Sequence, residues 1–127
     1  MAKIESHRDL IVWQKAMDLA VQVYRLASHF PATEPYRLTA QVTRAVASVP
    51  ANIAEGHARS TRKDYANFLA VAKGSLMETE TFIMLAVRLS YLSDEQAKAA
   101  LNLITEISKM ITAIRNKLRD SYAPHNL

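Results

Sequence analysis

The stretch LTAQVTRAVASVPANIAEGHARSTRK, residues 38–63, separates into three faces when it is read with the period of an α-helix. The apolar face consists of Leu38, Val42, Ala45, Val49, Ile53 and Gly56. The polar face, which begins one residue upstream, consists of Arg37, Gln41, Arg44, Ser48, Asn52, Glu55 and Arg59. The third face carries small side chains and a proline: Ala40, Thr43, Ala47, Pro50, Ala51, Ala54 and Ala58. Another helix could approach closely along this third face, so we expect a helix with more than one packing partner.

Pro50 lies inside this pattern and raises the question of whether the segment is one helix. A proline in a helix interior removes an amide donor and costs about 3 kcal/mol. The helix could therefore end before Pro50. The polar face keeps its phase from Arg37 to Arg59, however, so we predict one continuous helix over about residues 36–57 with a kink at Pro50.

Three other segments have helical periodicity and predict a bundle of the all-α class. These helices are expected over about residues 9–29, 62–91 and 93–119. Asp9 is a candidate N-cap of the first helix, and Ser60 or Thr61 of the third. Ser93 and Gln96 have the spacing of a capping box at the start of the fourth. Short connections between long helices predict an antiparallel up-down-up-down four-helix bundle, formed as a single domain over residues 1–127.

The composition excludes several classes of protein. The chain of 127 residues has no cysteine, which excludes disulfides, thiolate catalysis and cysteine–zinc sites. The apolar run at residues 82–87 is too short to span a bilayer, and the N-terminus has no apolar signal region. We expect a soluble cytoplasmic protein that does not contact membranes, with a disordered tail over residues 121–127.

The first helix has an apolar arc that is wider than a simple bundle requires. One side of the arc consists of Leu10, Trp13, Met17, Ala20 and Tyr24. The other side consists of Val12, Ala16, Leu19, Val23, Leu26 and Phe30. The two sides together cover more than half of the circumference, so one side is available for a second partner. With the small-residue face of the second helix, this surplus predicts self-association into a homo-oligomer.

Motifs for catalysis and metal binding are absent from the sequence. A di-iron bundle needs two Glu-x-x-His pairs, which do not occur here. The four histidines lie near expected helix ends or turns, and there is no Gly-x-Ser-x-Gly sequence. Two glycines are too few for a phosphate-binding loop. We expect no enzyme activity, no metal, no cofactor and no small-molecule substrate.

Two acidic residues of the third helix have unusual positions. Glu80 falls near the apolar side of the helical wheel, whereas Glu78 falls almost opposite and should be solvated or lie at an interface. A carboxylate at the core margin needs a partner. Glu80 could have local hydrogen bonds, or it could pair with an arginine of another helix or subunit, such as Arg44. An inter-subunit catalytic site around Glu78, Glu80 and Arg44 is the least favoured hypothesis, because no substrate is indicated.

The polar face of the second helix also has two interpretations. It is either an ordinary solvated face or a ledge that contacts a partner through Arg37, Arg44, Asn52, Glu55 and Arg59. A kink at Pro50 would free backbone carbonyls, and the Asn52 amide could satisfy one of them. We favour this structural role of Asn52 over ligand binding.

Basic residues form two clusters, one around the start of the third helix and one at the end of the fourth. The first contains Arg59, Arg62 and Lys63, and the second contains Arg115, Lys117 and Arg119. Helix capping and solubility are one interpretation of both clusters. The other is binding of phosphate backbones without base specificity, since no aromatic residue is interleaved for base stacking. The candidate nucleic-acid contacts are Arg37, Arg44, Arg59, Arg62, Lys63, Arg115, Lys117 and Arg119.

Three motifs in this order resemble one bacterial family. The sequence VPANIAEG at 49–56 is similar to the signature of the 23S rRNA intervening-sequence proteins. DLIVWQKAM at 9–17 is similar to the opening helix of that family, and FLAVAKGSLMETET at 68–81 with RLSYL at 88–92 to its third helix. The resemblance implies an all-α bundle, usually a homopentamer, without known catalysis. A related group serves as the accessory protein of diversity-generating reverse transcriptases and binds nucleic acid and the polymerase.

The motifs indicate which residues support the structure or its interfaces. The candidates are Trp13, Pro50, Asn52, Glu55, Gly56, Glu78 and Glu80. Our main functional hypothesis is a non-enzymatic, homo-oligomeric scaffold that contacts RNA or DNA, or a nucleic-acid enzyme, through basic surfaces. The alternative is a protein–protein adaptor that binds no nucleic acid.

Overall fold

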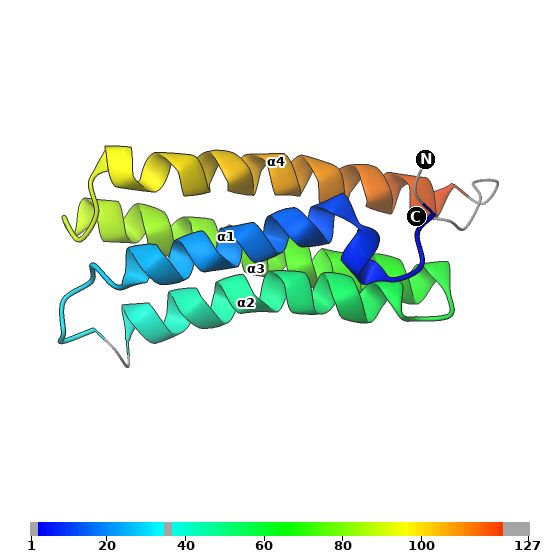
Figure 1. Cartoon of the computed structure of the whole chain (residues 1–127), viewed down its shortest axis with the longest axis horizontal. Helices are drawn as coiled ribbons and strands as arrows, with labels where there is room; N and C mark the ends of the chain where they lie inside the picture. The colour runs from blue at the N-terminus through cyan, green and yellow to red at the C-terminus, as the bar shows by residue number, and fades with distance from the viewer. Residues whose placement is uncertain (1–2, 35–36, 121–127) are drawn as a thin grey trace.

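Each periodic segment of the sequence forms one long helix in the computed structural model, which describes residues 3–34 and 37–120 (Figure 1). A short 3₁₀-helix, η1, comes first, and the described residues contain no β-strand. The elements are η1 (His7–Asp9), α1 (Ile11–Ala27), α2 (Leu38–His57), α3 (Arg62–Arg88) and α4 (Asp94–Arg119). The prediction of an all-α four-helix bundle is confirmed.

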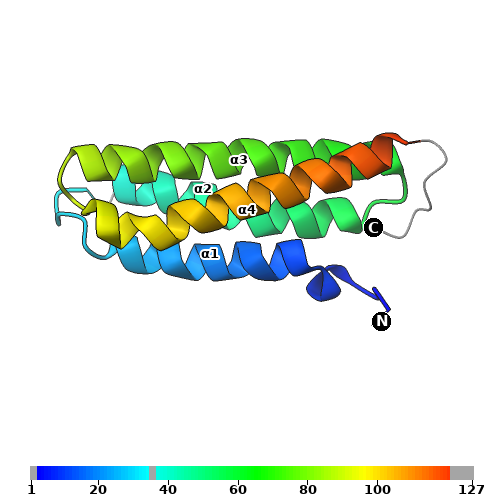
Figure 2. The ribbon, with the colours of Figure 1, turned by 90° about the horizontal axis from the view of Figure 1, so that it is seen from above.

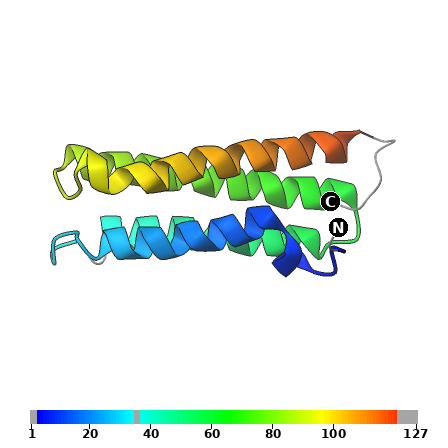
Figure 3. The ribbon, with the colours of Figure 1, turned by 45° about the horizontal axis from the view of Figure 1, so that its top comes forward.

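The four helices are arranged so that each one packs against two others. α2 contacts α1 and α3, and α4 contacts α3 and α1. The α3–α4 pair lies over the α1–α2 pair (Figure 3). α4 runs obliquely, from beside α1 at its start to beside the start of α3 at its end (Figure 2). The bundle therefore has two ends, each made of two helix starts and two helix ends.

The apolar face of α2 forms the centre of the core, as the sequence predicts. Its six members, Leu38, Val42, Ala45, Val49, Ile53 and Gly56, are all buried. Gly56 allows a close approach of α3, because a Cβ atom at this position would lie 2.6 Å from Cβ of Phe68. α2 and α3 also share the most extensive helix interface in the described residues.

α2 is continuous through Pro50, which is itself buried. The continuity that the polar face predicts is confirmed, while the kink stays a prediction. Pro50 withholds the amide that would bond the carbonyl of Val46, four residues earlier. The Asn52 amide instead donates to the carbonyl oxygen of Ser48 at 2.8 Å and to its Oγ at 2.9 Å. Asn52 thus supports the helix near the carbonyl that the proline leaves free, without bonding that carbonyl itself.

The helix caps agree with the sequence in two cases and differ in one. Ser93 and Gln96 form the predicted capping box, and Thr61 caps α3 by accepting from the Asp64 amide. The prediction that Asp9 caps α1 is wrong. Its carboxylate instead accepts from the amides of residues 5 and 6 and closes a capping box around η1, so α1 begins at Ile11 without a side-chain cap.

Some helix ends differ from the expected bounds for local reasons. α3 ends at Arg88 because Ser90 adopts a left-handed conformation, with φ 63°, and the Tyr91 amide turns back to the carbonyl of Ala86. α2 begins at Leu38, whereas residue 36 lies outside the described residues. The tail that the sequence predicts to be disordered, residues 121–127, also lies outside the described residues. Among the described helices none is both long and apolar enough to cross a membrane.

Candidate nucleic-acid interface

The two basic clusters of the sequence meet at one end of the bundle. Since α3 and α4 are antiparallel, the start of α3 lies beside the end of α4 (Figure 2). Between them lies a concave surface of about 640 Å³, which we call the basic hollow. It is lined by Arg62, Lys63, Ala66, Asn67, Arg115, Leu118 and Arg119. Four of these seven residues are cationic, and none is acidic.

Hydrogen bonds fix the edges of the basic hollow. Nη1 of Arg62 donates to the carbonyl oxygen of Asp120 at 2.7 Å, which ties the first residue of α3 to the C-cap of α4. Arg119 donates to the side-chain oxygen of Asn116 on its own helix. Nε of Arg115 is buried and is the one such side-chain atom without a hydrogen-bond partner in the described residues.

The cations that line the basic hollow take part in none of the ion pairs between described residues. These pairs join Lys15 to Glu106, Arg37 to Glu34 and Arg59 to Glu55. The start of α3 adds the positive end of its helix dipole, while the cations of α4 offset the negative end of theirs. The local potential should therefore be positive and attract anions.

The other predicted basic residues lie elsewhere. Arg59 pairs with Glu55 at 3.0 Å and lies over the ring of Phe68 at 4.7 Å, so it is separate from the basic hollow. Lys117 is exposed but does not line the hollow. Arg37 belongs to the opposite end of the bundle, next to Glu34. The structure thus brings together four of the eight candidate nucleic-acid contacts.

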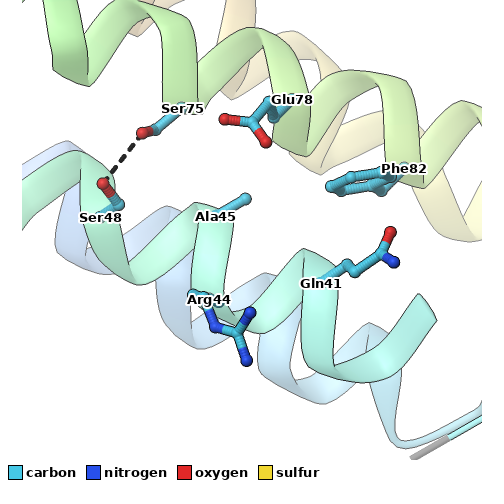
Figure 4. Close-up of a pocket in the computed structure, with 7 residues that line it drawn as sticks. All are labelled: Gln41, Arg44, Ala45, Ser48, Ser75, Glu78 and Phe82. Carbon is cyan, nitrogen blue, oxygen red and sulfur yellow. Dashed lines mark hydrogen bonds between the residues drawn. The ribbon is translucent and has the colours of Figure 1, made fainter. Parts of the chain in front are cut away.

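Arg44 lies in a second depression, the groove between α2 and α3 (Figure 4). This groove, of about 470 Å³, is lined by Gln41, Arg44, Ala45, Ser48, Ser75, Glu78 and Phe82. The hydroxyls of Ser48 and Ser75 join the two helices at 2.9 Å. Arg44 extends away from the Glu78 carboxylate across the groove, and no ion pair forms between them (Figure 4). The groove carries one charge of each sign and does not attract anions as the basic hollow does.

Within the single chain, Glu80 has neither the local hydrogen bonds nor the arginine partner that the sequence suggested. The carboxylate is half-buried and makes no ion pair with Arg44. No hydrogen bond connects it to another described residue. Ser75 faces α2. Glu80 comes five residues later, which corresponds to a rotation of about 140° around the axis of α3, so it lies on a different side of that helix. Partial exposure lets water solvate the carboxylate in place of a partner.

The remaining motif residues serve packing and local bonding. Trp13 is half-buried and meets the ring of His7 edge to face at 5.0 Å, which holds η1 against the bundle. Pro50 and Gly56 are buried in α2. Asn52 extends the Ser48–Ser75 link, and Glu55 is the partner of Arg59.

The two surfaces that predict self-association face solvent in part, because Leu10 and Pro50 are buried and Trp13 and Ala20 are half-buried. α1 exposes large apolar side chains, of which Ile11 is 60% and Tyr24 53% accessible, together with Met17 and Val21. The neighbouring helix α2 exposes the small residues Ala47, Ala51 and Ala58. The sequence pattern includes Met17 and Tyr24 but misses Ile11 and Val21.

The opposite end of the bundle has a polar cluster that the sequence did not reveal. Glu34, only 6% exposed, accepts from the Leu38 amide at 3.2 Å and from the Tyr91 hydroxyl at 2.9 Å. These bonds lower the pKa of Glu34, the Leu38 bond more than the Tyr91 bond, and Glu34 in turn raises the pKa of Tyr91. We call this arrangement the Glu34 clasp. It joins the α1–α2 connection to the α3–α4 connection, a contact between distant segments without a local sequence signal.

Comparison with known proteins places the chain in a family. Residues 8–113 match the family described as 23S rRNA-intervening sequence protein. A crystal structure of a protein of unknown function from the S23 ribosomal protein family of Bacteroides thetaiotaomicron is also similar, with 30% sequence identity and a TM-score of 0.75. The match covers 83% of this chain and 98% of that one. No curated protein matches the chain. The chain belongs to the 23S rRNA-intervening sequence protein family.

Proposed function

We propose that this protein is a non-enzymatic, homo-oligomeric scaffold that contacts nucleic acid, or a partner that processes nucleic acid, through the basic hollow. The observation that carries the proposal is the convergence of Arg62, Lys63, Arg115 and Arg119 on one concave surface without an acidic lining residue. Phosphate groups suit such a surface, because charge-assisted hydrogen bonds from arginine and lysine to phosphate are short and strong. Contacts to phosphate position a strand without reading its sequence.

Self-association would multiply these contacts. The exposed apolar residues of α1 and the small residues of α2 support an oligomer, and the number five follows only from the family resemblance. A pentamer of chains with a formal charge of +4 each would carry about +20 and five copies of the basic hollow. Several weak sites on one assembly bind one strand much more tightly than a single site does.

Size-exclusion chromatography with light scattering and absorbance ratios tests the assembly. A mass near five chains supports the pentamer, and co-eluting nucleic acid supports its binding. A monomer would contradict the proposed self-association, because the apolar surface of α1 would then remain in water.

The salt dependence of RNA binding tests the role of the basic hollow. We expect affinity for a short RNA to fall steeply with salt concentration, because each neutralised phosphate releases counterions. The double variant Lys63→Gln/Arg119→Gln should reduce the slope of log affinity against log salt by about one for each phosphate that is no longer neutralised. The variant Lys98→Gln/Lys109→Gln removes two charges of α4 outside the hollow and is the matched control. Equal slopes for the two variants would exclude the basic hollow as the contact.

A protein–protein adaptor is the second candidate, favoured by the exposed apolar side chains of α1. Monomeric proteins rarely expose large apolar patches without a partner. An adaptor would bind one protein with an affinity that does not depend on salt concentration. The variant Ile11→Ser/Val21→Ser would abolish that binding. Neither the wild type nor the variant would bind RNA.

A further inference from the structure

We infer that the basic hollow binds the terminal phosphate of a nucleic-acid strand, so that the protein distinguishes a phosphorylated end from an unphosphorylated one. This inference rests on the proposed function and names the chemical group that the hollow takes. Three properties of the hollow support it: its shape, its charge and its floor.

The shape of the hollow favours a group that projects. Its walls come from the first turns of α3 and the last turns of α4, so cations approach one volume from two helices. A phosphate within a strand has a sugar on both sides and reaches the bottom of a concave site only if the strand bends. A terminal phosphate has a sugar on one side only, so it can enter without this distortion.

The charge of the hollow matches a terminal phosphate better than an internal one. A phosphate monoester carries about −1.5 to −2 at neutral pH and offers three strong acceptor oxygens. An internal phosphodiester carries a single charge. The hollow provides three guanidinium groups and one ammonium group, and the Arg62 guanidinium also bonds the Asp120 carbonyl. Arg115 and Arg119 contribute their guanidinium groups from α4, and guanidinium geometry suits the oxygens of a phosphate.

The floor of the hollow can accommodate the nucleotide attached to that phosphate. Ala66 and Leu118 contribute apolar surface, and Leu118 is buried. Asn67 also lines the hollow and carries an amide that can donate and accept hydrogen bonds. The lining contains no aromatic side chain for base stacking, so we expect little preference among the four bases.

The test compares one short RNA labelled at its 3′ end, with either a phosphate or a hydroxyl at its 5′ end. Fluorescence anisotropy of the full-length protein gives the two affinities at equal salt. We expect the phosphorylated RNA to bind about tenfold more tightly, the size expected for one additional charge-assisted hydrogen bond. Lys63→Gln/Arg119→Gln should remove this preference, and Lys98→Gln/Lys109→Gln should retain it. Circular dichroism of each variant checks that the helices are intact.

The outcomes separate this inference from the proposed function. Equal affinity for both RNAs would overturn the inference while leaving nucleic-acid binding in place. Absence of binding to both would overturn the inference together with the RNA contact in the proposed function, and would leave contact with a protein partner as the remaining form of that function. Inorganic phosphate distinguishes a free anion from a strand end: if it displaces the phosphorylated RNA at equal concentration, the hollow is a site for free phosphate and the inference fails.

Discussion

The two ends of the bundle use their charged residues in opposite ways. In the Glu34 clasp, a buried carboxylate is bonded to the Leu38 amide and the Tyr91 hydroxyl, with Arg37 at 3.7 Å. At the basic hollow, four cations converge without a carboxylate in the lining. The helices there are held instead by close packing at Gly56 and by the Arg62–Asp120 bond. One end thus pairs a buried carboxylate with donors of the same chain, whereas the other gathers cations whose lining contains no carboxylate.

The largest effect on stability should come from substitution of Gly56, which packs against α3 at the end of the bundle that carries the basic hollow. Gly56→Ala gains about 1 kcal/mol of helix propensity. The new Cβ would lie 2.6 Å from Cβ of Phe68, and relief of such overpacking typically costs about 1–3 kcal/mol. We expect net destabilisation in chemical denaturation, because the clash involves an atom next to the backbone. Gly74→Ala is the matched control: nothing lies within 4 Å of its added Cβ, so it should stabilise the fold. Equal effects of both changes would contradict close packing at Gly56.

The Glu34 clasp should be the next most sensitive feature, and its effect should depend on pH. Glu34→Gln replaces the charged acceptor of two hydrogen bonds and should lower the free energy of unfolding at neutral pH. The pKa of Glu34 is lowered from its ordinary value of 4.5, so the folded state binds its proton less readily than the unfolded state. Its stabilisation is present above the ordinary pKa and is lost as pH falls through the lowered one. Denaturation of both proteins across this range should show the difference shrinking in acid, and a constant difference would exclude the charge as its cause.

Tyr91→Phe should have a smaller effect, because it removes one bond of the clasp and leaves the Leu38 amide on Glu34. The variant should melt below the wild type but above Glu34→Gln. Thermal melts of the single and double variants form a cycle, in which the double variant should be little worse than Glu34→Gln. Fully additive losses would mean that Tyr91 and Glu34 stabilise the fold independently.

The smallest effect should come from Lys63→Gln, even though this residue lies at the proposed binding site. Lys63 has no ion pair among the described residues, so its removal should change the free energy of unfolding by less than about 0.5 kcal/mol. Chemical denaturation measures this directly. A loss as large as that of Glu34→Gln would remove the contrast between the two ends.

The sequence predicts the core well because helical periodicity translates directly into burial. All six apolar residues assigned to the core face of the second helix are buried, and the buried Val46, which lies between two assigned faces, is missing from that set. Helix ends are predicted less well, because neighbouring turns compete for the same side chain. Asp9 closes a box with Ser6 and is therefore not the cap of α1.

The candidate site was predictable in its parts but not in its arrangement. Both basic clusters are visible in the sequence, and antiparallel helices already imply that the start of one lies near the end of the next. The sequence does not show that Arg59 turns toward Glu55 and Phe68, away from the hollow. Nor does it reveal Asn67 and Leu118 as lining residues, since neither carries a charge.

The order in which the helices pack has a consequence for how the chain folds. α1 with α2, α2 with α3 and α3 with α4 are consecutive in the sequence. Among the four long helices, the pair α1 and α4 is the one that packs together without being consecutive. Short loops close early at little entropic cost, so the α2–α3 hairpin should form in the transition state and α4 should dock on α1 later. Ile53→Val, in the α2 core face, should therefore slow folding. Lys15→Gln, which removes the α1–α4 ion pair with Glu106, should mainly speed unfolding, and stopped-flow kinetics would separate the two effects.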